Sequence, residues 1–363
     1  MAEELQLRLY RFDKRAAAAG ARVLQAAHYR HAIDATAAGE AAELGVALAH
    51  CENVARFWAD LPANWLTPRL FVDAVRELFA GLPGVRVRVL DEHELLARGF
   101  GGLLGVAAGS REPARLLVLD VGDVASVPAA RLPTLVGKGV TFDAGGISIK
   151  PAKDMYAMKA DMTGAAAVCA AAFGAAQLGG APCRVVVPLA ENLPSAAAVK
   201  PGDVLTLFGG TTVEVDNTDA EGRLLLADAV AFAAHEYGAR RIVTVATLTG
   251  AIQVALGAHY FGAFATHDAT FDALARAAAD SRTPAWRMPL DKIYRTQLRS
   301  DVADLLNCSR TPGGGACTAA WFVRSFAPDD ADFAHLDIAG IMQAKNGTMT
   351  GKPTRVLTRF LLQ

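Results

Sequence analysis

The side chains best suited to chemistry form two charged clusters in an otherwise apolar central region. The first lies in residues 217–223 (NTDAEGR), where two carboxylates and a guanidinium stand at the start of an apolar helix. Residues i and i+2 of an extended segment point to the same side, so Asp219 and Glu221 are expected to hold one ligand together. The second cluster lies upstream and consists of charged residues with glycines between them: Lys138, Asp143, Lys150 and Asp161.

The four acids indicate a metal-assisted reaction site. Buried together without partners, Asp143, Asp161, Asp219 and Glu221 would repel one another, and some would take up protons. Two divalent cations would balance the four charges, and ions that lie close together require at least one bridging carboxylate. Asp143 taken alone could equally sit in a surface loop, and a surface loop is the less favoured alternative for Asp219 and Glu221. The flanking glycines and apolar strands favour one shared site for the acids.

Three cations accompany the acids. Lys138 lies inside an apolar strand with glycine on both sides, so its amine needs an ion-pair partner or a lowered pKa. A nearby divalent cation could displace its proton and make the amine a ligand. Lys150 and Arg223 could stabilise an oxyanion that develops on a polarised carbonyl. Arg223 could alternatively be a structural partner of Asp219 or Asp228, and the sequence leaves that choice open.

Several other functions are disfavoured. The glycine-rich loops at 143–146 and 311–315 fit neither common phosphate-binding pattern, and no G-x-S-x-G motif of a serine hydrolase occurs. The formal net charge of -1 gives no general attraction for nucleic acid or an anionic membrane. The alanine- and glycine-rich stretch 164–183 imitates a membrane span, but its composition favours a buried helix. The acidic start indicates no signal peptide, and the five widely spaced cysteines indicate reduced thiols in a cytoplasmic protein.

Hydrophobic patterns predict the elements that position these residues. We expect strands at 85–90, 115–120, 134–141, 184–190, 241–248 and 333–338, and helices at 40–59, 69–80, 163–178 and 224–237. This alternation predicts an α/β fold with a central mixed, largely parallel sheet flanked by helices on both faces, whose sites gather at the carboxyl ends of strands. Residues 1–48, with a short strand at 7–12, are expected to form a reduced N-terminal region and linker helix, and residues 49–363 a catalytic domain.

Two blocks of the chain carry a family resemblance. Residues 136–150 (VGKGVTFDAGGISIK) and 217–224 (NTDAEGRL) resemble the two signature blocks of the leucyl aminopeptidase family, whose members are cytosolic dinuclear metallo-aminopeptidases. The similarity continues through 158–162, 246–251, 300–304 and 335–340 and covers the chain from about Glu52 to its end. The chain looks like a short form of the family, because members usually carry a larger N-terminal α/β domain.

The resemblance implies a role for each site residue. One metal ion would be held tightly by four residues: Lys138, Asp143, Asp161 and Glu221. A second, more exchangeable ion would be held by Asp143 and Glu221, which bridge, and by the side chain and carbonyl of Asp219. Lys150 and Arg223 match the catalytic cations, with a bicarbonate on the arginine as general base. The substrate would contact six residues: Met158, Thr247, Leu248, Gly250, Ala339 and Met342.

The implied activity is release of N-terminal amino acids, with apolar ones preferred, from peptides by a metal-bridging water. Manganese or zinc is the first expectation for the metals, with magnesium and cobalt as alternatives. The resemblance also implies a homo-hexamer. Two other functions stay open at this stage. One is a DNA-binding role, which the near-zero charge disfavours, and the other is a narrower activity on Cys-Gly or other dipeptides.

Overall fold

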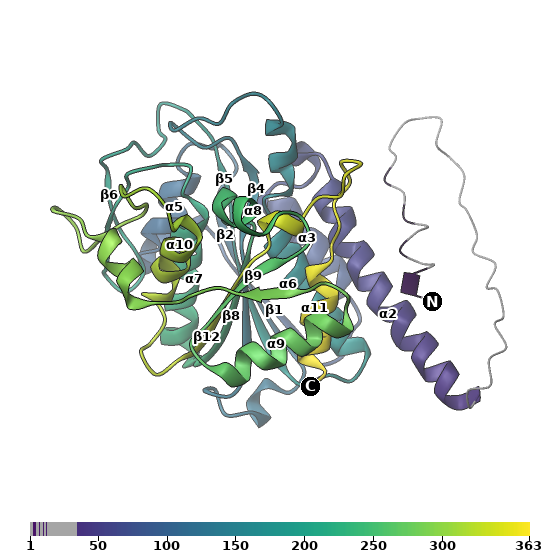
Figure 1. The fold of residues 1–363 in the computed structure, drawn as a ribbon. Coiled ribbons are helices and arrows are strands. Elements are labelled where there is room, and N and C mark those ends of the chain that lie inside the picture. Colours follow the sequence, from purple (N-terminus) through teal and green to yellow (C-terminus); the bar gives the residue numbers. More distant parts are fainter. Residues whose placement is uncertain (1–2, 5–6, 8–9, 11, 13–34) are drawn as a thin grey trace, which may run out of the picture.

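The structure of this 363-residue chain is a computed structural model that describes residues 3, 4, 7, 10, 12 and 35–363. The strand predicted at 7–12 falls largely outside these residues, and of the described ones Leu7 is helical while Tyr10 and Phe12 lie in no strand. Helix α2 (Ala35–Asp60) projects beyond the body of the molecule at its N-terminal end (Figure 1). It runs through the predicted domain boundary at residue 48, which stays a prediction.

A nine-stranded mixed sheet forms the centre of the molecule. Its strands pair in parallel except where β1 meets β2, β2 meets β5 and β12 meets β9. The predicted mixed, largely parallel sheet is therefore confirmed. In spatial order the strands are β1 (Val85–Leu90), β2 (Arg115–Val121), β5 (Cys183–Asn192), β3 (Pro133–Gly137), β8 (Arg241–Ala246), β12 (Asp332–Asp337), β9 (Phe261–Ala265) and β10 (Ala285–Arg287), with β4 (Gly139–Asp143) also paired to β5.

Helices cover both faces of this sheet, as predicted, and each face has its own hydrophobic core. Figure 1 shows α5, α7 and α10 gathered on one side and α2, α6 and α11 on the other. The first core receives α2, α3 (Pro68–Leu78), α6 (Thr163–Gln177), α9 (Asp268–Asp280) and α11 (Pro353–Leu361), and the second receives α4 (Glu92–Arg98), α5 (Gly101–Ala107), α7 (Gly222–Tyr237) and α10 (Gly315–Arg324).

Strand β2 shows how the sheet separates the two cores. Leu117 and Leu119 pack in the first core, whereas Leu116 and Val118 pack in the second. Successive side chains of a strand point to opposite faces, and burial of both faces is typical of a sheet covered by two helical layers. The strand therefore reads as one continuous apolar run.

The remaining elements are short and lie outside the main sheet. They are α8 (Gly250–Leu256), a small sheet of β6 (Val204–Thr206), β7 (Thr212–Glu214) and β11 (Leu305–Leu306), and the short helices η1 (Ala63–Trp65), η2 (Val124–Ser126), η3 (Met155–Ala160), η4 (Lys292–Leu298) and η5 (Ala339–Ile341).

The alanine- and glycine-rich helix α6 is buried from Thr163 to Ala175, as its composition predicted. Its small side chains let it approach the sheet closely, because a Cβ on Gly164 would lie 2.2 Å from the carbonyl oxygen of Val245. Within the described part of the chain, no helix combines the length and apolar character needed to cross a membrane.

The single strand predicted at 134–141 was wrong, because the chain breaks into β3 and β4 at Lys138. The Lys138 amide donates to the Val245 carbonyl at 3.0 Å, and the Lys138 carbonyl accepts from the Ala165 amide at 2.9 Å. A Cβ on Gly137 would lie 2.8 Å from the Gly164 carbonyl oxygen, and one on Gly139 would lie 2.5 Å from that of Pro188. The two glycines therefore allow the close packing that holds Lys138 at the break.

Candidate metal centre

Every residue that the sequence singled out for the site lines one cavity of about 410 Å³. The cavity lies at the carboxyl ends of the strands, as expected: Asp143 ends β4, Thr247 follows β8 and Ala339 follows β12. Other residues complete its wall: Asn217, Ala220, Thr249, Ala251, Gln253, Cys308 and Gly315.

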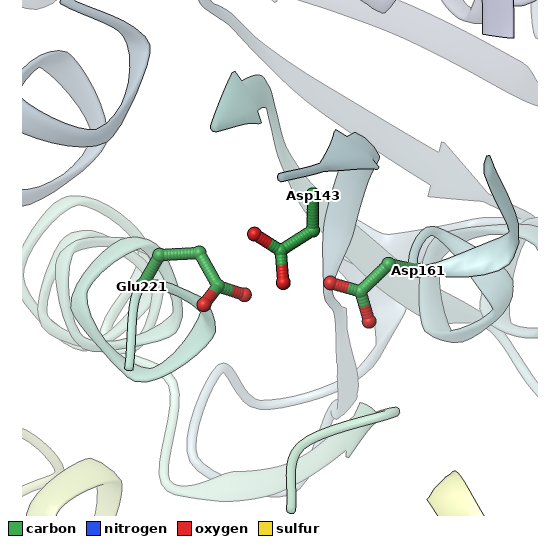
Figure 2. Close-up of side chains that lie close together, drawn as sticks. All are labelled: Asp143, Asp161 and Glu221. Atoms are coloured by element: carbon green, nitrogen blue, oxygen red, sulfur yellow. The ribbon is translucent and has the colours of Figure 1, made fainter. Parts of the chain in front are cut away.

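Three carboxylates form the deepest part of the site. Figure 2 shows Asp143, Asp161 and Glu221 with their carboxylates directed toward one another. One oxygen from each lies within 4.8 Å of the others, and the three residues are 2%, 5% and 2% exposed. They come from the end of β4, the residue after η3 and the residue before α7. Three buried carboxylates so close together fit a divalent cation, because their mutual repulsion otherwise has to be relieved by protons or cations.

The Lys138 side chain is enclosed by these acids. Its Nζ lies 2.8 Å from Asp161 Oδ2, 2.7 Å from Glu221 Oε1 and 3.0 Å from the Thr247 carbonyl oxygen. Burial alone lowers the pKa of Lys138, but the surrounding carboxylates outweigh it and raise the pKa overall. Without a metal ion these contacts favour the ammonium form, and the amine could act as a ligand only where a bound cation replaces its proton. A Cβ on Gly222 would lie 2.7 Å from Nζ, so glycine at 222 leaves the amine its space.

Lys150 neutralises a second pair of acids. Its Nζ lies 2.8 Å from Asp143 Oδ2 and also contacts Asp219 Oδ1. The site therefore brings four acidic side chains together with two lysines, so the acids outnumber the lysines. Burial, followed by the charge of Asp143, raises the pKa of Glu221 to about 8. Burial also raises the pKa of Asp161 to about 6. Hard carboxylate oxygens with one amine nitrogen suit manganese, zinc or magnesium.

The prediction that Asp219 and Glu221 lie on one side of an extended segment was wrong, although both residues line the cavity. Residues 217–220 form a turn, in which the Ala220 amide donates to the Asn217 carbonyl at 3.1 Å. Glu221 has helical backbone angles and directly precedes α7, so the pair is not extended. The turn leaves the Asp219 side chain 32% exposed at the mouth of the cavity, while Glu221 lies inside.

Arg223 is 6% exposed and lies in the first turn of α7, as predicted. Its Nη1 donates to the Asn307 carbonyl at 2.8 Å, whereas its Nε has no hydrogen-bond partner among the described residues. Burial lowers the pKa of Arg223. Asp228, one of its two suggested structural partners, instead accepts from the backbone amides of Leu103 and Phe208, each at 2.8 Å.

Two buried residues that the sequence reasoning did not select support the site. Asn192 Nδ2 donates to Asp143 Oδ1 at 2.8 Å and to the Thr218 carbonyl at 3.1 Å. Asp337 accepts from the Thr249 hydroxyl at 2.6 Å and from the Leu248 amide at 3.2 Å. The sequence could have indicated Asp337, because an acidic residue at the end of an apolar strand is unusual. For Asn192, its place at the end of a strand was the only feature of the sequence that pointed to the site.

Comparison with known proteins agrees with this geometry. Residues 53–358 match the family described as "Cytosol aminopeptidase family, catalytic domain". The chain is 46% identical to "Cytosol aminopeptidase" of Dictyostelium discoideum over 327 residues, which is 87% of this chain and 62% of that protein. It is 44% identical to "Probable cytosol aminopeptidase" of Polaromonas naphthalenivorans (strain CJ2) over 335 residues, which is 91% of this chain and 64% of that protein.

A solved structure is also similar. "Bottromycin maturation enzyme BotP in complex with Mn" superimposes with a TM-score of 0.88 at 37% identity, covering 99% of this chain and 78% of that one. The chain therefore belongs to the cytosol aminopeptidase family through its catalytic domain, which confirms the family resemblance. It spans less than two thirds of the length of the Dictyostelium and Polaromonas relatives.

Proposed function

We propose that this chain is a dinuclear metal-dependent aminopeptidase that releases N-terminal amino acids, preferentially apolar ones, from peptides. The observation that carries the proposal is the convergence of four acids and two lysines on one cavity. Membership in the cytosol aminopeptidase family and the manganese named for the similar BotP structure support a divalent metal.

The donor set divides into two metal positions that share residues. Lys138, Asp143, Asp161 and Glu221 would hold one ion, and Asp143, Asp219 and Glu221 the other, with the Asp219 carbonyl as a further ligand. Manganese or zinc suits both, and magnesium or cobalt are alternatives. When bound, the two ions supply Lewis acidity that polarises the peptide carbonyl and lowers the pKa of a water molecule.

Lys150 and Arg223 provide the fixed positive charge next to these positions. The Lys150 side chain is 21% exposed, so its ammonium can turn from the carboxylates toward a carbonyl oxygen that gains negative charge. Arg223 is anchored by Asn307 and lines the cavity, so the part of its guanidinium that faces the cavity can hold an anion. We assign bicarbonate to Arg223, where it would supply a general base.

The other residues of the cavity set the substrate preference. Met158 and Met342 line it with Thr247, Gly250 and Ala339, and this neutral wall favours an apolar first side chain. Each extra methylene in such a pocket changes binding by only about 1–3 kcal/mol, so several apolar residues should be accepted. The Leu248 amide already donates to Asp337, which leaves the Leu248 carbonyl to accept a hydrogen bond from the substrate.

The test uses a leucyl peptide with a free N-terminus and the same peptide with its N-terminus acetylated. After reconstitution with Mn2+, only the free peptide should lose its first residue, and a chelator should stop the reaction. Glu221→Ala should abolish turnover, whereas Glu236→Ala, which removes a surface carboxylate paired with Arg88, should retain it. Full activity of Glu221→Ala would refute the site assignment.

The assembly and location are further proposals. We propose a homo-hexamer in the cytoplasm, in line with the family resemblance and with five free cysteines. Light scattering on the eluting protein gives the native mass, and a monomeric mass for active enzyme would contradict the hexamer.

A further inference from the structure

The last residue of helix α2, Asp60, is a buried acid that no step of the proposed reaction uses. Its exposed fraction is 4%. The C-terminal end of a helix carries a partial negative charge that disfavours a carboxylate, and burial disfavours the charge further. An acid at such a position therefore needs tertiary contacts that compensate for both effects.

Asp60 contacts two segments, and one of them carries a methionine of the metal cavity. Its carbonyl accepts a hydrogen bond from Lys159 Nζ at 2.6 Å, and Lys159 directly follows Met158 in η3. Its Oδ1 accepts a hydrogen bond from the Met349 amide at 3.0 Å. The end of α2 thus joins η3 to the segment that contains Met349.

The segment that contains Met349 leads back to the other methionine of the cavity, Met342. Gln343 and Met349 form an antiparallel bridge. The Thr350 amide then donates to the Met342 carbonyl at 2.9 Å. Arg56, near the end of α2, holds the other side of Met349, because its Nε donates to the Met349 carbonyl at 3.2 Å. Fixing Met349 therefore also fixes the backbone of Met342.

Tyr10 occupies the second oxygen of the Asp60 carboxylate. Its hydroxyl donates to Asp60 Oδ2 at 2.9 Å, and the guanidinium of Arg56 lies 4.2 Å from the centroid of the Tyr10 ring. Because each carboxylate oxygen has its own partner, the orientation of the Asp60 side chain is fixed.

We propose that Asp60 is a positioning residue that shapes the pocket for the first side chain of the substrate, by holding the segments of Met158 and Met342 together. Both methionines line the metal cavity, and their contact with that side chain rests on the proposed function. A methionine side chain is unbranched and flexible, so its place in a pocket depends on the backbone that carries it. A shift of either segment should cost contact with a large apolar side chain and matter little for a small one.

The test compares a leucyl with an alanyl peptide in Mn2+-loaded wild type and Asp60→Ala. The ratio of kcat/KM for the leucyl peptide to that for the alanyl peptide should fall at least about fivefold in Asp60→Ala, which is part of the roughly 10- to 200-fold that one methylene group can carry. The change should appear in KM rather than in kcat, because the pocket contacts the side chain equally in the ground state and the transition state.

Two further variants serve as rescue and control. Asp60→Asn keeps an oxygen that can accept from the Met349 amide, so it should restore most of the leucyl preference. Asp120→Asn removes a carboxylate that pairs with Arg184 and does not line the cavity, and it should leave the preference unchanged.

A second measurement needs no turnover. The methyl signals of Met158 and Met342 in an NMR spectrum of isotope-labelled protein, assigned with Met158→Leu and Met342→Leu, should shift in Asp60→Ala and stay in place in Asp120→Asn. Lys159→Met removes the contact with the Asp60 carbonyl and leaves the carboxylate, so it provides the same test if Asp60→Ala does not fold.

Unshifted methyl signals would overturn the positioning role. Shifted signals with an unchanged leucyl-to-alanyl ratio, or an equal loss for both peptides, would overturn the role in substrate preference. A wild-type chain without peptidase activity would refute the proposed function, while the methyl signals would still decide whether Asp60 positions the two methionines.

Discussion

Replacing Asn192 by alanine should weaken metal binding although Asn192 is not among the proposed ligands. Its Nδ2 joins two loops, because it donates to Asp143 Oδ1 at 2.8 Å and to the Thr218 carbonyl at 3.1 Å. The Thr218 hydroxyl then donates to the Gly145 carbonyl at 2.6 Å. The Asn192 amide group thus ties the loop that carries Asp143 to the turn that carries Asp219.

The magnitude follows from the bonds that are lost. Asp143 accepts from Asn192, from the Gly145 amide at 2.9 Å and from Lys150 at 2.8 Å, so the substitution removes one of these three donors. A hydrogen bond to a charged group contributes about 1.5–3 kcal/mol, which corresponds to roughly 10- to 150-fold in metal affinity. Losses of about 10- to 100-fold are typical when a group that orients a ligand is removed.

The assay is a calorimetric titration of chelator-treated protein with Mn2+. Asn192→Ala should show the expected loss of affinity, because it removes the donor to Asp143 Oδ1. Thr283→Val is the matched control, since it removes a buried hydroxyl that donates to the Ser281 carbonyl and does not line the cavity. Unchanged Mn2+ affinity in Asn192→Ala would refute the reasoning.

Three further predictions concern the charges and backbone of the site. In metal-free protein, Lys138→Met should lower the free energy of unfolding by about 3–5 kcal/mol, because the substitution leaves buried carboxylates unpaired. Urea unfolding measures this free energy, and an unchanged urea midpoint would contradict the prediction. The fold raises the pKa of Glu221 from 4.5 to about 8, so its contribution to stability is present at low pH and lost as pH rises through this window. As the pH rises from 4.5 to about 8, the melting temperature of metal-free protein should therefore fall while its affinity for Mn2+ rises. Glu221→Gln should flatten the pH dependence of the melting temperature, and an equal fall in that variant would contradict the role of Glu221. Asp337→Asn should weaken the hydrogen bonds that position Leu248 and Thr249 by about 1 kcal/mol, which corresponds to a rise in KM of roughly fivefold and a smaller change in kcat. Steady-state kinetics measure both constants, and a larger change in kcat than in KM would contradict the prediction.

The strands and helices were predictable where hydrophobic runs are long. The strands at 85–90, 184–190 and 333–338 and helix α6 were predicted close to their observed bounds, because buried strands and helices on a two-sided sheet need long apolar runs. The break at Lys138 was not predicted, since it depends on how closely the chain packs against Gly164 and Pro188. The short strands β6, β7 and β11 were missed because each is only 2 or 3 residues long, too short for a periodic pattern.

The sequence alone determined the family, the fold class and the residue types of the site, because these follow from motifs and hydrophobic spacing that lie within short segments. Tertiary structure decided which charges meet. Asp143, Asp161 and Glu221 come from different segments, and only folding brings their oxygens within 4.8 Å of one another. The pairing of Lys138 and Lys150 with separate acids, and the support from Asn192, depend on loop geometry in the same way. Contacts between residues that are distant in sequence are set by how the elements pack, and a pattern within a short segment does not predict that packing.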